Sequence, residues 1–392
     1  MQPDVRVVAG PRYRIAHVIT RLELGGAQQN TLYCTRHHDR ERFEVDLVAG
    51  RGGLLDDEAL SIEDAGVRLL PSLRHAIAPV WDPVALFRLR SYFKARRVDL
   101  VHTHSSKAGI LGRLAAVLAG VPAVVHTVHG WSFNRTQPAR LRRVYVGLER
   151  LAATWTDRMI AVSADNRREG LALGIGREEQ YSVVRSGIEL DGLGPSGTAR
   201  ETLRRSLGYG PDEIVVGALA CLKPQKAPLD FVRAAAAAHA RDPRLRFFIA
   251  GDGELRSAAE ALIRELGLEG IVQLLGWRRD VADLLRVMDL FLLTSLFEGL
   301  PRAVLQAMAA GTPVVATAVD GTPEVVEHRR TGLLVPPSRP ESAAEAMLEL
   351  AGDELLRRRC VAEARRRVGS EFDIRRMVSE LERTYLSLLE GR

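Results

Sequence analysis

The chain has few cysteines, few aromatic residues and no long hydrophobic run. Its three cysteines, Cys34, Cys221 and Cys360, lie far apart and form no CxxC pair, so we expect neither a disulfide framework nor a zinc knuckle. The longest nearly continuous apolar stretch, residues 114–125, is shorter than the about 20 residues that a membrane-spanning helix needs. We therefore expect no transmembrane helix.

Two further absences limit where the protein acts and what it binds. The first ten residues, MQPDVRVVAG, contain no apolar core of the kind that a signal peptide carries, so we expect a cytoplasmic protein. Aromatic residues make up only 5% of the chain and do not alternate with basic residues, as a base-stacking platform requires. We therefore expect no nucleic-acid partner.

Lysine is scarce, because 51 of the 55 basic residues are arginines. Such a bias is explained by genome composition, which makes a lysine the unusual choice at any position. Lys223 and Lys226 are two of only four lysines and lie three residues apart. The pair is a candidate for function, with chance clustering as the alternative.

Positive charge gathers in the first half of the chain. Residues 1–190 contain 27 basic and 20 acidic residues, whereas residues 191–372 contain 24 and 25. A basic half indicates attraction to an anionic membrane surface or a phosphorylated substrate. An ordinary solvated surface is the alternative.

Apolar β-branched runs alternate with helical patterns along the whole chain, which predicts an α/β fold with parallel strands covered on both faces. A Gly, Ser and Pro-rich linker at residues 186–199 separates two such sheets. We expect Rossmann-like domains at residues 1–190 and 191–372, with a last helix at 373–392 that returns to the first domain. The expected strands are residues 13–20, 43–50, 67–72, 98–105, 123–130 and 158–163, then 213–221, 245–251, 271–277, 290–295, 313–319 and 332–337.

Ligands of open α/β sheets bind beyond the carboxyl ends of the strands, and two such domains place the site in the cleft between them. Gly25 and Gly26 follow the first strand, where glycine permits a tight turn and close approach of the backbone to a ligand. A turn needed only for packing is the alternative. The spacing does not match GxGxxG, which disfavours a dinucleotide dehydrogenase.

Four histidines, His102, His104, His126 and His129, lie at the ends of two neighbouring expected strands. An HxH pair on a strand places both side chains on one face, which suits a metal, but no cysteine or carboxylate lies nearby in the sequence. Bonds from these histidines to the backbone are the simpler expectation. His129 differs, because Gly130 follows it where the chain leaves the strand, and we expect His129 to face the substrate.

The segment ACLKPQKAPLDF, residues 220–231, joins the expected strand at 213–221 to a helix. Lys223 and Lys226 at this turn, beside a helix N-terminus, would form a positive pocket for a diphosphate. Two solvated loop lysines are the alternative.

The segment EGLPRAVLQAMAAGTPVVAT, residues 298–317, places a proline where a helix begins. Glu298 then precedes the helix, and Gln306 lies on its second turn among residues that should be buried. A glutamine in that setting needs hydrogen-bond partners, either the backbone or ligand hydroxyls.

Taken together, nearly the whole chain resembles the retaining glycosyltransferases of family four, which have a GT-B fold of two Rossmann-like domains facing across a cleft. The matching segments are GGAQQNTL, HTHSSKAGILGRLA, HTVHG, ACLKPQKAPLDF, AGDGE, LFEGLP with AAGTPVVAT, and GTPEVVEHRRTGLLVPP. The resemblance implies transfer of a hexose or N-acetylhexosamine from a nucleotide-diphosphate sugar to a glycan or polyprenyl-diphosphate-linked acceptor. It implies no cofactor beyond this donor.

The resemblance also implies roles for individual residues. Lys226, with Lys223, holds the donor diphosphate; Glu298 contacts the transferred sugar, and His129 lies by the reacting centre. The other residues that the resemblance places at the donor are Gly25, Gly26, Gly251, Gly253, Gly299, Leu300, Gln306 and Glu324. The implied mechanism is front-face transfer.

Two positions depart from the family pattern. The family usually has a glutamate at position 306, where its carboxylate accepts from both ribose hydroxyls, and Gln306 retains only one carbonyl acceptor and no charge. The arginine that the family often carries before the lysine turn is replaced by Cys221 or a neighbour. No DxD pair lies at a plausible donor site, so we expect no divalent metal, with Lys226 in its place.

The acceptor and the basic first half suggest a protein peripheral to the inner face of the cell membrane. The segments LFRLRSYFKARR and ARLRRVYVGLERL, residues 86–97 and 139–151, could form basic amphipathic helices or ordinary coverings of the sheet. Two other functions remain open: a nucleotide-sugar 2-epimerase, which would carry carboxylates for proton transfer near the sugar, and a non-catalytic nucleotide-sugar sensor, which Gln306 motivates.

Overall fold

The computed structural model describes residues 11–134, 137–193 and 197–391. The chain forms two compact units, Met1–Arg185 with Arg375–Arg392, and Ser186–Ile374. The first ten residues and positions 194–196 of the expected linker lie outside the described residues.

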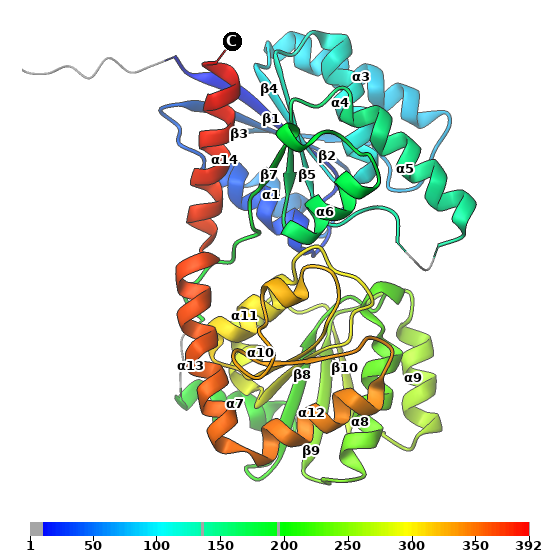
Figure 1. Ribbon diagram of the computed structural model, residues 1–392, viewed down its shortest axis with the longest axis vertical. Coiled ribbons are helices and arrows are strands. Elements are labelled where there is room, and N and C mark those ends of the chain that lie inside the picture. Colours follow the sequence, from blue (N-terminus) through cyan, green and yellow to red (C-terminus); the bar gives the residue numbers. More distant parts are fainter. Residues whose placement is uncertain (1–10, 135–136, 194–196, 392) are drawn as a thin grey trace, which may run out of the picture. The chain divides into compact units, whose positions relative to one another are not determined.

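The first unit is built on a sheet of seven parallel strands in the order β3-β2-β1-β4-β5-β6-β7 (Figure 1). Its strands are β1 (Tyr13–Arg21), β2 (Phe43–Gly50), β3 (Ala65–Leu70), β4 (Leu100–His104), β5 (Ala123–Val128), β6 (Arg158–Ala161) and β7 (Tyr181–Val183). Its helices are α1 (Gly26–His37), α2 (Asp56–Leu60), α3 (Trp81–Arg96), α4 (Ser106–Ala119), α5 (Ala139–Ala153), α6 (Ala164–Ala172), the 3₁₀ helix η1 (Glu178–Gln180) and α14 (Ile374–Leu389).

Helices cover both faces of this sheet. On one face, Val18 and Val101 of the central strands pack with Leu89 and Phe93 of α3 and with α4. On the other face, the side chain of His102 on β4 contacts Tyr385 of α14. In Figure 1, α14 is the red helix that runs along the first unit. Strands buried on both faces explain why their sequences are continuous apolar runs without polar alternation.

The second unit has six parallel strands in the order β10-β9-β8-β11-β12-β13. They are β8 (Ile214–Leu219), β9 (Leu245–Ala250), β10 (Val272–Gly276), β11 (Leu290–Leu293), β12 (Val314–Thr317) and β13 (Leu333–Val335). The helices are α7 (Gly197–Ser206), η2 (Pro224–Lys226), α8 (Pro228–His239), α9 (Arg256–Glu265), α10 (Val281–Val287), α11 (Arg302–Ala310), η3 (Thr322–Glu324), α12 (Pro340–Gly352) and α13 (Glu354–Glu371).

The core of the second unit is formed by the inward side chains of the strands and by helices α8 and α12. Phe247 of β9 and Leu292 of β11 are fully buried there beside Phe231 of α8 and Met347 of α12. Burying a side chain of this size stabilises the fold by about 1.5–3 kcal/mol. This core fixes the carboxyl ends of β8 and β11, from which the candidate site is built.

All twelve expected strands are present in the structure. A thirteenth, β7, was not predicted, because its three residues at the edge of the first sheet are too short to produce a recognisable apolar run. Among the described residues, no helix is both long and apolar enough to span a membrane.

Candidate functional site

The candidate donor site lies in the second unit, beyond the carboxyl ends of β8 and β11. These strands are neighbours at the centre of the sheet, and the strand order runs outward from them in opposite directions. Such a switch point is where open α/β sheets bind ligands. The loop after β8 carries Lys226, and the loop after β11 carries Glu298.

The loop after β8 is held in a strained turn. Ala227, between η2 and α8, has φ 44° and ψ 57°, the left-handed conformation that a residue with a Cβ rarely adopts. The hydroxyl of Thr294 donates to the carbonyl oxygens of Lys226 and Ala227 at 3.0 and 3.2 Å. Strain of this kind persists only where surrounding contacts enforce it, and it clusters at functional sites. The conformation that presents Lys226 is therefore built into the fold.

The side chains of Glu298 and Lys226 form an ion pair. The Glu298 side chain is only 6% exposed, forms an ion pair with the Lys226 ammonium, and accepts the Ser295 hydroxyl at 2.6 Å. Its backbone N–H donates to Oδ2 of Asp320 at 2.8 Å. A carboxylate with so little solvent needs such partners to remain charged. These contacts hold Oε1 and the backbone of Glu298 in a defined orientation.

Two further hydrogen bonds join the loops that carry the pair. The side-chain amide of Gln225 donates to the carbonyl of Phe297 at 2.9 Å, and the N–H of Leu296 donates to the carbonyl of Gln225 at 2.8 Å. Gln225, Ser295 and Asp320 were not predicted from the sequence, although Ser295 lies only three residues before Glu298. Each acts by supporting the loop conformation, and no spacing rule marks that role.

Gly251 and Gly253 are required by backbone packing. Gly251 has φ +151°, and a Cβ added there would meet the carbonyl oxygen of Ala220 at 2.0 Å. A Cβ on Gly253 would meet the carbonyl oxygen of Leu222 at 2.6 Å. Both glycines thus let the loop after β9 pack on the loop that carries Lys226. Their predicted contact with the donor stays a prediction.

The remaining predicted donor residues of this unit differ in how far they are buried. Lys223 is exposed, whereas Gly299 and Leu300 are buried in the loop just before α11. Glu324 is half-buried at the end of η3. Helix α11 begins at Arg302, directly after Pro301, which confirms the predicted helix start.

The neighbours of Gln306 on α11 are buried, as predicted: Val304, Leu305, Ala307 and Met308. Gln306 itself is half-buried, because α11 turns this position away from its buried face. Within the described residues, the Gln306 side chain makes no hydrogen bond, so the backbone does not satisfy its amide. Solvent or ligand hydroxyls are left as its partners.

Gly25, Gly26 and His129 belong to the first unit. Gly25 precedes α1 with φ −159°, an extended conformation open to any residue, and an added Cβ would meet only the flexible Gln28 side chain. The expected tight turn is therefore not what requires glycine there. His129 is half-buried after β5, and its Nε2 lies 3.1 Å from Nδ1 of His104.

The histidines near His129 make side-chain contacts instead of the expected backbone contacts. His102 and His104 share one face of β4, as predicted, and His17 on β1 joins them, so that one ring nitrogen of each lies within 4.8 Å of the others. His126 lies on the opposite face, where it contacts the Thr103 hydroxyl at 2.9 Å. Proximity alone would suit a metal. However, both ring nitrogens of His102 already have partners, Tyr385 and Thr127, at 2.5 and 2.7 Å.

Burial governs the protonation of these histidines. Desolvation lowers the pKa of His17, His102 and His104 well below the usual value, and neighbouring histidines lower it further. The rings are therefore neutral at pH 7. In this state they act as hydrogen-bonded links, each with one donor and one acceptor nitrogen.

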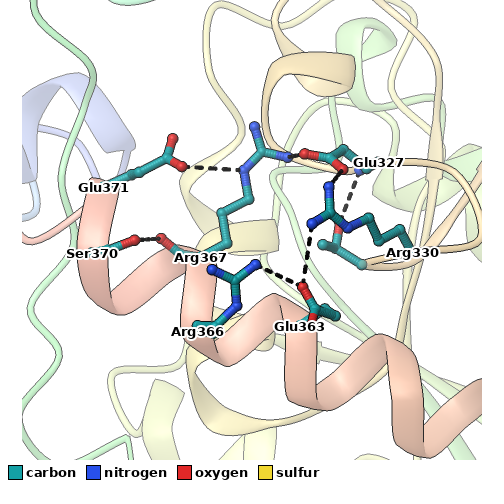
Figure 2. Close-up of a pocket in the computed structure, with 8 residues that line it drawn as sticks. Glu327, Arg330, Glu363, Arg366, Arg367, Ser370 and Glu371 are labelled. Carbon is teal, nitrogen blue, oxygen red and sulfur yellow. Dashed lines mark hydrogen bonds and ion pairs between the residues drawn. The ribbon is translucent and has the colours of Figure 1, made fainter.

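A separate cavity of about 130 Å³ lies between α13 and the loop after η3. Figure 2 shows that its charged side chains point toward one another. The ion pairs join Arg330 to Glu327 and Glu363, Arg366 to Glu363, and Arg367 to Glu327 and Glu371. Three arginines balance three glutamates, so this cavity offers no excess charge to a phosphate. The ion pairs around it hold α13 against the loop after η3.

Comparison with known proteins agrees with this geometry. The family described as Glycosyltransferase Family 4 matches residues 24–191, and Glycosyl transferases group 1 matches residues 199–367. The chain is 32% identical to the Escherichia coli UDP-Gal:alpha-D-GlcNAc-diphosphoundecaprenol alpha-1,3-galactosyltransferase over 389 residues, which cover 97% of this chain and 98% of that protein. It is 27% identical to the putative glycosyltransferase EpsD of Bacillus subtilis, covering 79% of this chain and 83% of EpsD.

Solved structures agree on the fold. Anabaena HepE in complex with UDP and glucose superposes with a TM-score of 0.83 at 23% identity, covering 96% of this chain and all of that one. Sucrose-phosphate synthase of Thermosynechococcus elongatus also gives 0.83, at 20% identity, covering 97% of this chain and all of the synthase. The chain therefore belongs to the retaining glycosyltransferases of family four, enzymes of the GT-B fold that transfer sugars from nucleotide-sugar donors.

Proposed function

We propose that the chain transfers a hexose, with galactose as the first candidate, from a uridine diphosphate sugar to an N-acetylhexosamine linked to polyprenyl diphosphate. The similarity to the Escherichia coli galactosyltransferase carries this proposal, because it extends over 97% of this chain and 98% of that protein. Similarity restricted to the second unit would support only a shared donor. Here it includes the first unit, to which we assign the acceptor.

The second unit supplies groups suited to the donor. Lys226 places a cation where a departing diphosphate develops negative charge, and electrostatic stabilisation of this kind is usually the largest contribution to catalysis. Glu298 orients the transferred sugar, and the backbone N–H groups of Gly299 and Leu300 lie in the same loop. His129 of the first unit faces the acceptor. In the proposed front-face reaction, the acceptor hydroxyl attacks on the side from which the diphosphate leaves.

Lys226 also replaces a divalent cation in this proposal. Full activity in EDTA supports metal independence. Activity that EDTA abolishes and Mn²⁺ restores would contradict it.

We further propose that the first unit binds an anionic membrane surface through α5. The apolar residues of α5 that are more than a third exposed recur at helical spacing on one side, and arginines lie beside them. They are Leu141, Val144, Leu148 and Leu151, with exposed Arg140 and Arg143. A basic helix with an exposed apolar row suits the headgroup region of a bilayer. By contrast, α3 covers the sheet with Leu89 and Phe93, although its Phe87 is exposed.

Flotation with phosphatidylglycerol vesicles at low and high salt tests the membrane proposal. We expect binding at low salt that Leu148→Gln with Leu151→Gln weakens. Leu355→Gln on α13, at a position 83% exposed, is the matched control and should have no effect. Equal flotation of all three proteins, or none by the wild type at low salt, would contradict the proposal.

The catalytic proposal is tested with purified protein and a panel of UDP-, GDP- and ADP-sugars. Thermal stabilisation and donor hydrolysis identify the donor, and transfer to a short lipid analogue of N-acetylglucosamine diphosphate identifies the acceptor. A transferase forms an α-linked disaccharide. An epimerised donor would indicate a nucleotide-sugar 2-epimerase instead, and donor binding without turnover would indicate a sensor.

A further inference from the structure

Four imidazoles in the first unit form one continuous hydrogen-bonded chain that begins at a carboxylate of α14. Glu382 Oε1 lies 3.0 Å from His38 Nδ1, and His38 Nε2 lies 3.1 Å from His17 Nε2. His17 Nδ1 lies 3.0 Å from His104 Nε2, and His104 Nδ1 lies 3.1 Å from His129 Nε2. The chain thus connects α14 to the residue placed at the acceptor.

The carboxylate determines the direction of the first two hydrogen bonds. An ionised Glu382 can only accept, and its Oε1 already accepts the backbone N–H of Asp39 at 2.8 Å. His38 must therefore carry its proton on Nδ1 and donate it to Glu382. A neutral His38 then has an unprotonated Nε2, which can only accept, so His17 must donate from its own Nε2.

The same reasoning fixes the direction of the remaining hydrogen bonds between the histidines. Because His17 donates from Nε2, its Nδ1 is an acceptor, and His104 must donate to it from Nε2. His104 Nδ1 is then an acceptor, so His129 must donate from Nε2. Each neutral ring has one N–H, so one carboxylate fixes all four tautomers.

The surroundings keep His38, His17 and His104 neutral, as these tautomers require. Burial lowers the pKa of His17 and His104 well below the usual value. Burial also lowers the pKa of His38, although the hydrogen bond to Glu382 opposes this shift, and the positive charge of Arg40 adds to the lowering at both His17 and His38.

We propose that Glu382 is a positioning residue that acts through His38, His17 and His104 to hold His129 as the Nε2–H tautomer, with Nδ1 as a hydrogen-bond acceptor. An acceptor nitrogen suits a sugar hydroxyl, which donates. The wrong tautomer would present an N–H to that hydroxyl's proton and repel it. This inference rests on the proposed function in that it takes His129 to face the acceptor.

The neighbouring His102 provides a control, because it lies beside the chain without belonging to it. Its ring centre is 4.2 Å from that of His104, but its nitrogens contact Tyr385 and Thr127. Tyr385→Phe removes a buried hydrogen bond made by the same helix, α14, and leaves the hydrogen bonds from Glu382 through the four histidines intact. A general effect of damage to α14 should therefore appear in this variant as well.

The experiment is two-bond ¹H–¹⁵N spectroscopy of the full chain labelled with ¹⁵N-histidine, which distinguishes the two neutral tautomers. We expect the Nε2–H form at His129 in the wild type, in Tyr385→Phe and in Glu382→Gln, whose amide oxygen can still accept from His38. In Glu382→Met the His129 signal should become a mixture of tautomers. Thermal unfolding of each variant confirms that it is folded.

Kinetics provide the second measurement. Because tautomer control is lost, Glu382→Met should lower kcat about tenfold or more, with little change in the donor KM. Glu382→Gln should keep most of the wild-type kcat. An unchanged His129 signal in Glu382→Met overturns the proposal. So does Zn²⁺ binding that shifts the His17 and His104 signals of the wild type, because these nitrogens would then be ligands. If no donor is turned over, the proposed function fails, and the spectra alone decide this inference.

Discussion

Lys226 forms an ion pair with Glu298, whose side chain is 6% exposed and also accepts the Ser295 hydroxyl. The two loops that follow the central strands of the second unit thus carry one charge-neutral pair. A diphosphate that approaches Lys226 competes with this carboxylate for the ammonium. The contribution of Lys226 to donor binding is therefore the difference between two charge-assisted interactions.

Lys226→Ala should weaken donor binding by up to about 2 kcal/mol, or up to about thirtyfold in Kd, because a hydrogen bond to a charged group contributes on this scale and the ion pair with Glu298 offsets part of it. Isothermal titration with the donor identified by the screen measures the change. Lys223→Ala is the matched control: Lys223 is exposed and lies in the same loop, and we expect a smaller effect. Equal losses in both variants would mean that the loop attracts the donor only by its overall charge.

Gln306→Glu should tighten donor binding about tenfold, because a carboxylate can accept from both ribose hydroxyls while the amide offers one carbonyl oxygen. The side chain is half-buried and makes no hydrogen bond among the described residues, so the substitution breaks no internal contact. Titration with the 2′-deoxy form of the same donor is the control, and the gain should largely disappear there. A gain that persists without the 2′-hydroxyl would show that Gln306 does not contact the ribose.

Much of the fold and part of the site could be predicted from the sequence. Continuous β-branched runs identify strands that are buried on both faces, and the loops after β8 and β11 could be picked out because a rare lysine and a proline-led helix mark them. The hydrogen-bond partners of Glu298 could not be predicted from the sequence. Ser295 lies in the same loop as Glu298 and contacts it only in the folded loop conformation. Asp320 follows β12 and reaches Glu298 only because β12 pairs with β11.

The histidine chain shows the same limit more sharply. The HxH pattern on β4 indicated a cluster, but His17 joins it only because β1 pairs with β4. His38 follows α1 and joins through its contact with His17. Glu382 lies 344 residues from His38 in the sequence. Only the packing of α14 on the first sheet reveals that contact.

Glu149→Ala should destabilise the first unit by about 3–5 kcal/mol, the usual cost of leaving a buried charge without its partner. The Arg113 side chain is fully buried, and its guanidinium contacts Glu149 Oε2 at 2.7 Å. The double variant Arg113→Met with Glu149→Leu removes both charges and should be less destabilised than the single variant. Urea denaturation measures both. A double variant that is less stable than Glu149→Ala would show that Arg113 stabilises the fold without its carboxylate.

The first unit should lose stability as the pH falls below about 6.5, because it buries five histidines whose pKa is lowered. They are His17, His38, His102, His104 and His126. Below pH 6.5 these histidines bind protons in the unfolded chain but remain unprotonated in the folded chain. The free energy of unfolding therefore falls with falling pH until each folded pKa is reached, by at most about 1.4 kcal/mol per pH unit for each histidine.

Urea denaturation at pH 7.5 and pH 5.5 measures this loss. Of the four tryptophans, only Trp277 belongs to the second unit, so fluorescence in a Trp277→Phe background reports on the first unit. We expect a loss of several kcal/mol at pH 5.5, and His126→Asn should reduce that loss by about 1.4 kcal/mol, because one buried group no longer titrates. The carboxylates whose pKa is lowered, such as Glu44 and Asp280, lose their contribution only below this range. Equal stability at the two pH values would mean that these histidines remain accessible to protons in the folded chain.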